Sequence, residues 1–301
     1  MNKIIQVINL LMPTTNFDAL AVGVIDFKSS SFKVVEANLF EGNLKLKAEP
    51  TLYFDLASLT KPLTNSLGYF LSPESFTPEM ELCLNHRGGL PAWGILPDKG
   101  WQEQILSYPI KESETLYSDF SALRVYLELK KKGYDLKAEC SKVWDKETLF
   151  WLDLPEHFPT PQTGHKHGRP NYGQVHDPNA WIIRDFCTHA GLFSTVDGLC
   201  RTLLNYETRT GFIHKVQTKL ETDKHRFCHG WDRVENPQET LAGKGCGPLT
   251  FGHLGFTGTS IWIDAERLLG HVILSNATKN HWYDKHGLNE IRRAVGELVW
   301  N

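Results

Sequence analysis

The sequence lacks a charge excess, a long apolar run and any low-complexity tract. Its 32 Lys and Arg residues against 35 Asp and Glu residues leave a net charge of −3, too little to hold nucleic acid or an anionic membrane surface. No window approaches the roughly 18 uninterrupted apolar residues that a membrane span needs. We therefore expect a soluble globular protein without nucleic-acid or membrane partners; its oligomeric state stays open.

Cysteines and leader signals are also scarce. The six cysteines stand far apart and form no C-x-x-C pair, which excludes a disulfide scaffold. The first 20 residues carry one lysine and an apolar run interrupted by Asn and Gln, with no small-x-small cleavage site before Asp18. We expect an amphipathic helix here instead of a signal peptide, and a cytoplasmic protein with reduced thiols.

What is present is a core-forming composition, 41% hydrophobic and 11% aromatic, with strand patterns at both ends and helical patterns between them. The strands are predicted over 19–27, 32–35, 256–264 and 268–275, and the helices over 4–12, 63–71, 118–132, 196–206 and about 288–300. The long stretch 155–179 is too irregular for any element and is expected to be a functional loop.

This order predicts an α/β protein. An antiparallel sheet, flanked by the N- and C-terminal helices, would form a discontinuous domain from 1–62 and 228–301. A mostly helical domain, 63–227, would be inserted into it.

One segment carries a reactive pair. Ser58-Leu-Thr-Lys61 is an S-x-x-K pattern, which on a helix places the hydroxyl and the ammonium on one face. The same pattern occurs by chance from Ser30 to Lys33, so the tetrapeptide alone also fits an N-cap serine and a solvated lysine. Pro62 implies that the helix starts at about Ser58, where free N–H groups can stabilise an oxyanion.

Further segments follow in a recognisable order. FDLASLTKPL (54–63), NHRGGLPAW (85–93), YSD (117–119) and GHLGFTGTS (252–260) look like a nucleophile motif, an H-T-S-G-L-P segment, a Y-x-N motif and a K-T-G or H-x-G strand. From about Ala19 to Trp300 the chain resembles the serine β-lactamase-like family. That family includes class C β-lactamases, penicillin-binding proteins, D-aminopeptidases and carboxylesterases.

The resemblance implies a serine hydrolase that works through an acyl-enzyme. Ser58 would be the nucleophile, Lys61 the general base and Tyr117 the proton relay, with the N–H groups of Ser58 and Phe256 forming the oxyanion hole. Whether Lys61 or Tyr117 is the base stays open. No cofactor is implied, and the partner would be a small-molecule or peptide substrate.

Two departures from the family pattern bear on the substrate. Asp119 stands where the family has Asn; it accepts hydrogen bonds only and would keep Lys61 charged, which favours Tyr117 in deprotonation, unless it is simply a first-turn acid. His253, with Gly255 in an H-x-G triplet, replaces a lysine, and a largely neutral imidazole attracts carboxylates less. The alternative is a core histidine whose hydrogen bonds are satisfied by the backbone.

These departures favour a peptidase, including one for peptides with D-amino acids, or an esterase over a β-lactamase or DD-peptidase. The competing hypothesis is a non-hydrolysing sensor that binds peptidoglycan fragments or β-lactams through Ser58. Turnover separates the two.

The segment 175–181 (VHDPNAW) resembles a V-H-D-x-N-A segment found in part of the family. Its His176, Asp177 and Trp181 are candidate substrate contacts, or a structural brace. His176 and Asp177, together with His165, His167 and His189, raise the alternative of a zinc hydrolase. The spacing and the absence of H-E-x-x-H argue against that alternative, and no metal is expected.

Overall fold

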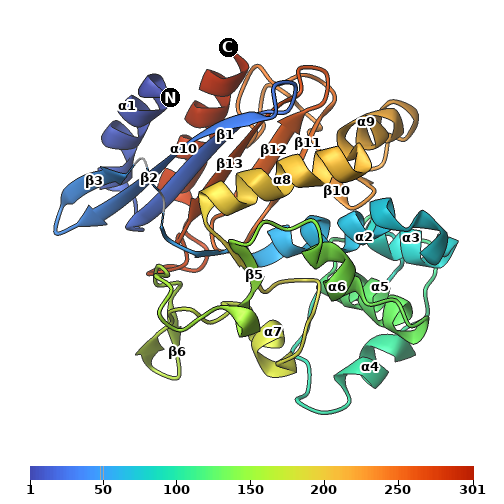
Figure 1. The fold of residues 1–301 in the computed structure, drawn as a ribbon. Helices are drawn as coiled ribbons and strands as arrows, with labels where there is room; N and C mark the ends of the chain where they lie inside the picture. The colour runs from blue at the N-terminus through green and yellow to red at the C-terminus, as the bar shows by residue number, and fades with distance from the viewer. Residues whose placement is uncertain (48, 50) are drawn as a thin grey trace.

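The computed structural model describes residues 1–47, 49 and 51–301. An eight-stranded antiparallel sheet has the order β3-β2-β1-β13-β12-β11-β10-β9 (Figure 1). Its strands are β1 (Ala19–Asp26), β2 (Ser31–Phe40), β3 (Asn43–Lys47), β9 (Phe227–Cys228), β10 (Trp231–Arg233), β11 (Thr250–Leu254), β12 (Ser260–Asp264) and β13 (Leu269–Ser275). The first and last strands of the chain meet in its middle, with Leu20 opposite Ser275.

Helices cover both faces of this sheet, so its central strands are buried on both sides. Successive side chains of β1 point to opposite faces. Leu20 and Val22 join the core under α1 (Asn2–Leu11) and α10 (His286–Trp300), whereas Ala21 faces the other side. There α8 (Val196–Thr210) crosses β1 and β13 (Figure 1). The predicted α/β architecture, with flanking terminal helices, is confirmed.

The rest of the chain forms a region of short helices below the sheet in Figure 1. Its helices are α2 (Leu67–Leu71), α3 (Pro78–Leu84), α4 (Trp101–Ser107), α5 (Asp119–Lys131), α6 (Leu136–Ser141) and α7 (Pro178–Ile183). Its small sheets pair β4 (Phe54–Asp55), β8 (Leu192–Ser194) and β5 (Thr148–Phe150), and separately β6 (His165–Lys166) with β7 (Arg169–Pro170). The helix α9 (Phe212–Thr222) instead contacts α8 and β9 and lies beside the sheet (Figure 1).

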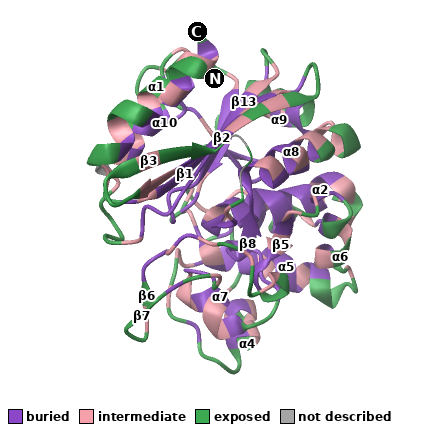
Figure 2. Ribbon diagram, turned by 60° about the vertical axis from the view of Figure 1, so that its left-hand side comes forward, coloured by how far each residue is buried: buried purple, intermediate pink, exposed green. Residues whose placement is uncertain are grey.

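One hydrophobic core cluster runs through both regions, and Figure 2 shows buried residues continuing from the sheet into the helices below it. The division into 1–62 plus 228–301 and 63–227 therefore stays a prediction. The helix α8 lies within the span assigned to the insertion, yet it packs on the sheet. Within the part of the chain that the structure describes, no helix is long and apolar enough to cross a membrane.

Two sequence expectations are wrong in detail. The strand predicted over 256–264 begins only at Ser260, because Gly258 at φ +108° makes a turn between β11 and β12. His253 therefore lies on a strand of its own, paired with Ile261. The stretch 155–179 is not without regular structure, since it contains the β6–β7 hairpin and the start of α7.

Candidate active site

The helix that carries Ser58 begins where the sequence predicts. A 3₁₀ turn, Ala57–Leu59, leads through Lys61 into a π-helical turn, Pro62–Ser66, and then into α2. Ala57 has φ +48°, a left-handed conformation that costs an L-residue roughly 1–2 kcal/mol. Its N–H donates to Asp55 Oδ1 at 2.8 Å, which stabilises this turn and holds Ser58 in the first turn of the helix.

Three polar side chains meet at the floor of the site. Lys61 Nζ donates to Ser58 Oγ at 2.9 Å and lies 2.6 Å from Asp119 Oδ1. Burial lowers the pKa of Lys61, but the Asp119 carboxylate and the Tyr117 hydroxyl outweigh burial and raise that pKa above its ordinary value. The lysine is therefore an ammonium in the resting site, as the presence of Asp119 predicts.

Tyr117 lies over this ion pair, with its ring centroid 4.8 Å from Lys61 Nζ. Burial raises the pKa of Tyr117, although Lys61 opposes the shift. Its ring packs against His86 at 4.6 Å and His253 at 5.8 Å between centroids. Burial and the nearby Lys61 lower the pKa of His253 to about 3, so its neutral imidazole supplies no charge to stabilise a phenolate.

His253 is fully enclosed in the protein. Its Nδ1 lies 2.8 Å from its neighbour's carbonyl oxygen on Leu254, and its Nε2 has no partner among the described residues. His253 thus packs against the Tyr117 ring and does not line the cavity described below. The choice of base between Lys61 and Tyr117 stays open.

The two predicted oxyanion donors lie on segments that are bonded together. Thr257 Oγ1 donates to Asp55 O at 2.7 Å, and Thr259 Oγ1 donates to Leu56 O at 2.9 Å. These bonds fix the turn after β11 against the backbone that leads into Ser58. Within the described residues, the N–H groups of Ser58 and Phe256 donate to no protein acceptor.

Gly255 is required by this close approach. A Cβ at this position would lie 2.6 Å from Leu56 O and 1.9 Å from Thr259 Oγ1. No larger residue fits without moving the turn away from the nucleophile. The structure thus places Gly255 in the packing of the two segments, outside the cavity lining.

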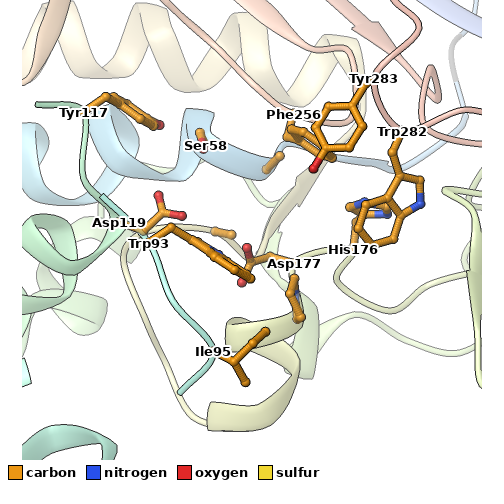
Figure 3. A pocket seen from close by; sticks show the side chains of 13 residues that line it. Ser58, Trp93, Ile95, Tyr117, Asp119, His176, Asp177, Phe256, Trp282 and Tyr283 are labelled. Atoms are coloured by element: carbon orange, nitrogen blue, oxygen red, sulfur yellow. The ribbon is translucent and has the colours of Figure 1, made fainter. Parts of the chain in front are cut away.

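A cavity of about 460 Å³ opens over Ser58 (Figure 3). Of the residues predicted to contact substrate, Asp119, His176 and Asp177 line it, together with Ser58, Tyr117 and Phe256. Trp181 lines an adjoining hollow beside His167 and Lys166. The remaining lining residues are Ala57, Trp93, Ile95, Pro178, Ala190, Trp282 and Tyr283.

The predicted 175–181 segment both lines the cavity and braces it. Asp177 Oδ1 accepts from Ala180 N and lies 2.8 Å from His189 Nε2. Burial raises the pKa of Asp177, but His189 outweighs it and lowers the value to about 2; the Asp177 carboxylate in turn raises the pKa of His189 against burial. The two form an ion pair, and the carbonyl of His189 accepts from Lys61 Nζ at 3.0 Å.

Some site residues were missed by sequence reasoning. Asn179 accepts from Leu96 N at 2.9 Å and donates to Gly94 O at 2.8 Å, which holds the loop with Trp93 and Ile95 at the cavity. Asp55 accepts from His176 N at 2.6 Å, and burial raises its pKa to about 6. Asn179 and Asp55 lie inside the segments 175–181 and 54–63, which resemble family motifs. Their place in these segments was the signal that could have identified them as site residues.

The candidate zinc ligands do not come together among the described residues. Among the residues that the structure describes, no group of three or more His, Cys, Asp or Glu side chains could hold a metal ion. His165 and His167 are exposed on the β6–β7 hairpin, whereas His176 and His189 are buried at the cavity.

Comparisons with known proteins identify the family and the fold of the chain. The family model described as Beta-lactamase matches residues 145–295, half of the chain; the match includes the H-x-G strand but begins after Ser58. A "Putative D-alanyl-D-alanine carboxypeptidase" of Salmonella typhi is 34% identical over 131 residues, which are 40% of this chain and 29% of that protein. This chain thus spans less than a third of the length of that curated relative.

Solved structures share the fold. A class C beta-lactamase from Rhodobacter sphaeroides has a TM-score of 0.63 at 15% identity over 99% of both chains. A Beta-Lactamase/D-Alanine Carboxypeptidase from Pseudomonas syringae has a TM-score of 0.63 at 12% identity over 97% of both chains.

Proposed function

The chain belongs to the beta-lactamase family, and on that premise we propose that it is a serine hydrolase that cleaves an ester or amide through an acyl-enzyme on Ser58. The observation that carries this proposal is the chain of contacts from Ser58 Oγ to Lys61 Nζ and on to Asp119, with Tyr117 over the ammonium. It lies at the floor of a cavity large enough for a small substrate.

The reaction needs the Lys61–Tyr117 pair to have lost one proton, since both groups have raised pKa values in the resting site. The pair then takes the proton of Ser58 while Oγ bonds to the substrate carbonyl carbon. The electron pair of the C=O bond moves onto its oxygen, and the N–H groups of Ser58 and Phe256 stabilise that oxyanion.

Collapse of this intermediate breaks the bond between the carbonyl carbon and the leaving group. The leaving group receives a proton from Tyr117, and the pair returns to its state before attack. A water molecule then repeats the sequence on the acyl-enzyme: it gives a proton to the pair, bonds to the carbonyl carbon and releases the acid. The proton ends on Ser58 Oγ.

A phosphonate ester that traps activated serines tests the proposal. Mass spectrometry with peptide mapping is expected to find one adduct on Ser58, absent from Ser58→Ala and slowed in Lys61→Ala. Ser30→Ala is the matched control, because Ser30 heads the second S-x-x-K pattern and lies in the turn after β1. An adduct elsewhere, or none on folded protein, would refute the proposal.

A measurement of turnover distinguishes hydrolysis from the competing hypothesis of a sensor. A substrate that acylates Ser58 and is released as acid supports hydrolysis, whereas a permanent adduct with every ester or amide offered would support a binder. We further propose a cytoplasmic location; the six cysteines are free and buried, as suits a reducing compartment. Cell fractionation tests this.

A further inference from the structure

We propose that the cavity binds an uncharged, apolar acyl group, so that the substrate is a hydrophobic ester or amide and not a carboxylate-bearing peptide or β-lactam. This inference rests on the proposed function, because it names the substrate of the same Ser58 site. It is carried by the side chains that form the cavity wall and by the charges they lack.

Exposed apolar side chains gather at this cavity. Trp93, Ile95, Phe256, Trp282 and Tyr283 all line it, and their exposed fractions run from 38% to 82%. They are five of the eleven large apolar side chains that are exposed among the described residues. Exposed apolar groups scattered singly need no explanation, but a cluster around one hollow marks a binding surface.

The aromatic side of this wall is ordered by contacts between its rings. Trp282 meets His176 edge-on at 4.9 Å between centroids, and Phe256 meets Trp282 at 6.3 Å and Tyr283 at 5.7 Å. Such edge-to-face pairs stabilise a fixed arrangement of rings. Trp93 and Ile95 lie on another side of the cavity (Figure 3), so an occupant is enclosed between apolar surfaces.

The charges at the cavity do not suit an anion. No lysine or arginine is among the lining residues that the structure describes, whereas two carboxylates, Asp119 and Asp177, are. Lys61 is already paired with Asp119 beneath the surface. The amine of Lys285 lies over the Phe256 ring, 4.9 Å from its centroid, and is bonded to Phe256 O at 2.7 Å. A substrate carboxylate would lose water and gain no cation from the lining residues.

A cationic acyl group is also disfavoured, although aromatic rings and carboxylates can bind cations. Asp119 is neutralised by Lys61, and Asp177 is neutralised by His189 at 2.8 Å. Both carboxylates therefore already hold a charge partner. The cavity therefore has an apolar wall, and the charges at its floor are paired with one another. These surroundings fit a neutral acyl chain.

The first experiment compares p-nitrophenyl esters of the acetyl, butyryl, hexanoyl and octanoyl groups. We expect kcat/KM to rise about fourfold per added methylene until the cavity is filled, as burial of each methylene predicts. Six-carbon acyl groups ending in a carboxylate or an ammonium are the matched probes for charge. Both are expected to react at least about a hundredfold more slowly than hexanoyl.

Variants link this preference to the wall. Trp282→Ala is expected to lower the octanoyl-to-acetyl ratio of kcat/KM at least tenfold, and Trp282→Leu, which keeps an apolar side chain, by less. Phe40→Ala is the matched control, because Phe40 is 63% exposed on β2 and does not line the cavity. It should leave the ratio unchanged, and circular dichroism checks the fold of each variant.

The outcomes separate this inference from the proposed function. A flat or falling ester series, or a preference for either charged probe, with turnover still dependent on Ser58, would overturn the inference alone. A Trp282→Ala ratio equal to that of the wild type would overturn it as well. Failure of Ser58 to form the phosphonate adduct would instead refute the proposed function.

Discussion

The floor and the wall of the cavity are built in opposite ways. The floor consists of buried or half-buried polar groups: Lys61 Nζ lies 2.9 Å from Ser58 Oγ and 2.6 Å from Asp119 Oδ1. The wall consists of exposed apolar side chains from separate loops, such as Trp93 and Trp282. The comparison teaches that the nucleophile and its lysine partner depend on local spacing, whereas substrate choice depends on long-range assembly and can change while that pair stays fixed.

Removing the nucleophile breaks the floor alone and has the largest expected effect. In Ser58→Ala no oxygen is left to form the acyl-enzyme, so kcat/KM should fall by at least about 10⁴-fold. The melting temperature should stay within a few degrees, since Ser58 is only half-buried. Steady-state kinetics and a thermal melt check both, and retained hydrolysis would mean that another residue is the nucleophile.

Tyr117→Phe keeps the ring in place and removes only the hydroxyl. If that hydroxyl carries the proton to the leaving group, kcat should fall roughly 10²–10⁴-fold. The loss should be largest for leaving groups of high pKa, because these need protonation most. Kinetics with phenyl and ethyl esters measures the trend; a fall of less than threefold for both would reduce Tyr117 to a packing residue.

Asp119→Asn tests the electrostatics of the floor. The Asp119 carboxylate raises the pKa of Lys61, so wild-type kcat/KM should increase with pH into the alkaline range, where the Lys61–Tyr117 pair loses its proton. Asn removes that charge, and the rising limb should move about one pH unit or more toward acid. Acylation by penicillin should also improve, since Asn can donate to its amide carbonyl. Unmoved pH profiles would contradict this account.

The smallest effect on turnover is expected from groups that change only the stability in acid. Burial lowers the pKa of His176 and His271 to about 4 and that of His253 to about 3, below the unfolded value of about 6.5. Unfolded chains thus bind more protons below pH 6.5, and the free energy of unfolding should fall by up to about 1.4 kcal/mol per pH unit for each histidine. Asp55, with its pKa raised to about 6, opposes this in part.

Urea titrations between pH 7 and pH 5 measure that slope. His271→Asn is the informative variant, because His271 is buried in the sheet away from the cavity. It should reduce the slope without altering the pH profile of turnover. A slope equal to that of the wild type would mean that acid acts on other groups.

The floor could be predicted because Ser58 and Lys61 stand three residues apart at a helix start and because the order of the motifs, with YSD at 117–119, resembles that of a known family. The part of the wall formed by Trp282 and Tyr283 could not be predicted. Trp282 and Tyr283 lie in a loop with no periodicity, and only the fold brings them to Phe256. His189 stood among the candidate zinc ligands, but its pairing with Asp177 follows from tertiary packing.

The pairing of the first strand with the last strand has a consequence for synthesis. More than 240 residues separate the end of β1 from the start of β13. A ribosome adds roughly 5–20 residues per second, so the β1–β2–β3 meander waits about 12–50 s with an unpaired hydrophobic edge. That edge would recruit other nascent chains if left bare. We therefore expect chaperones to bind this early meander during synthesis. The yield of expressed protein should then depend on that binding.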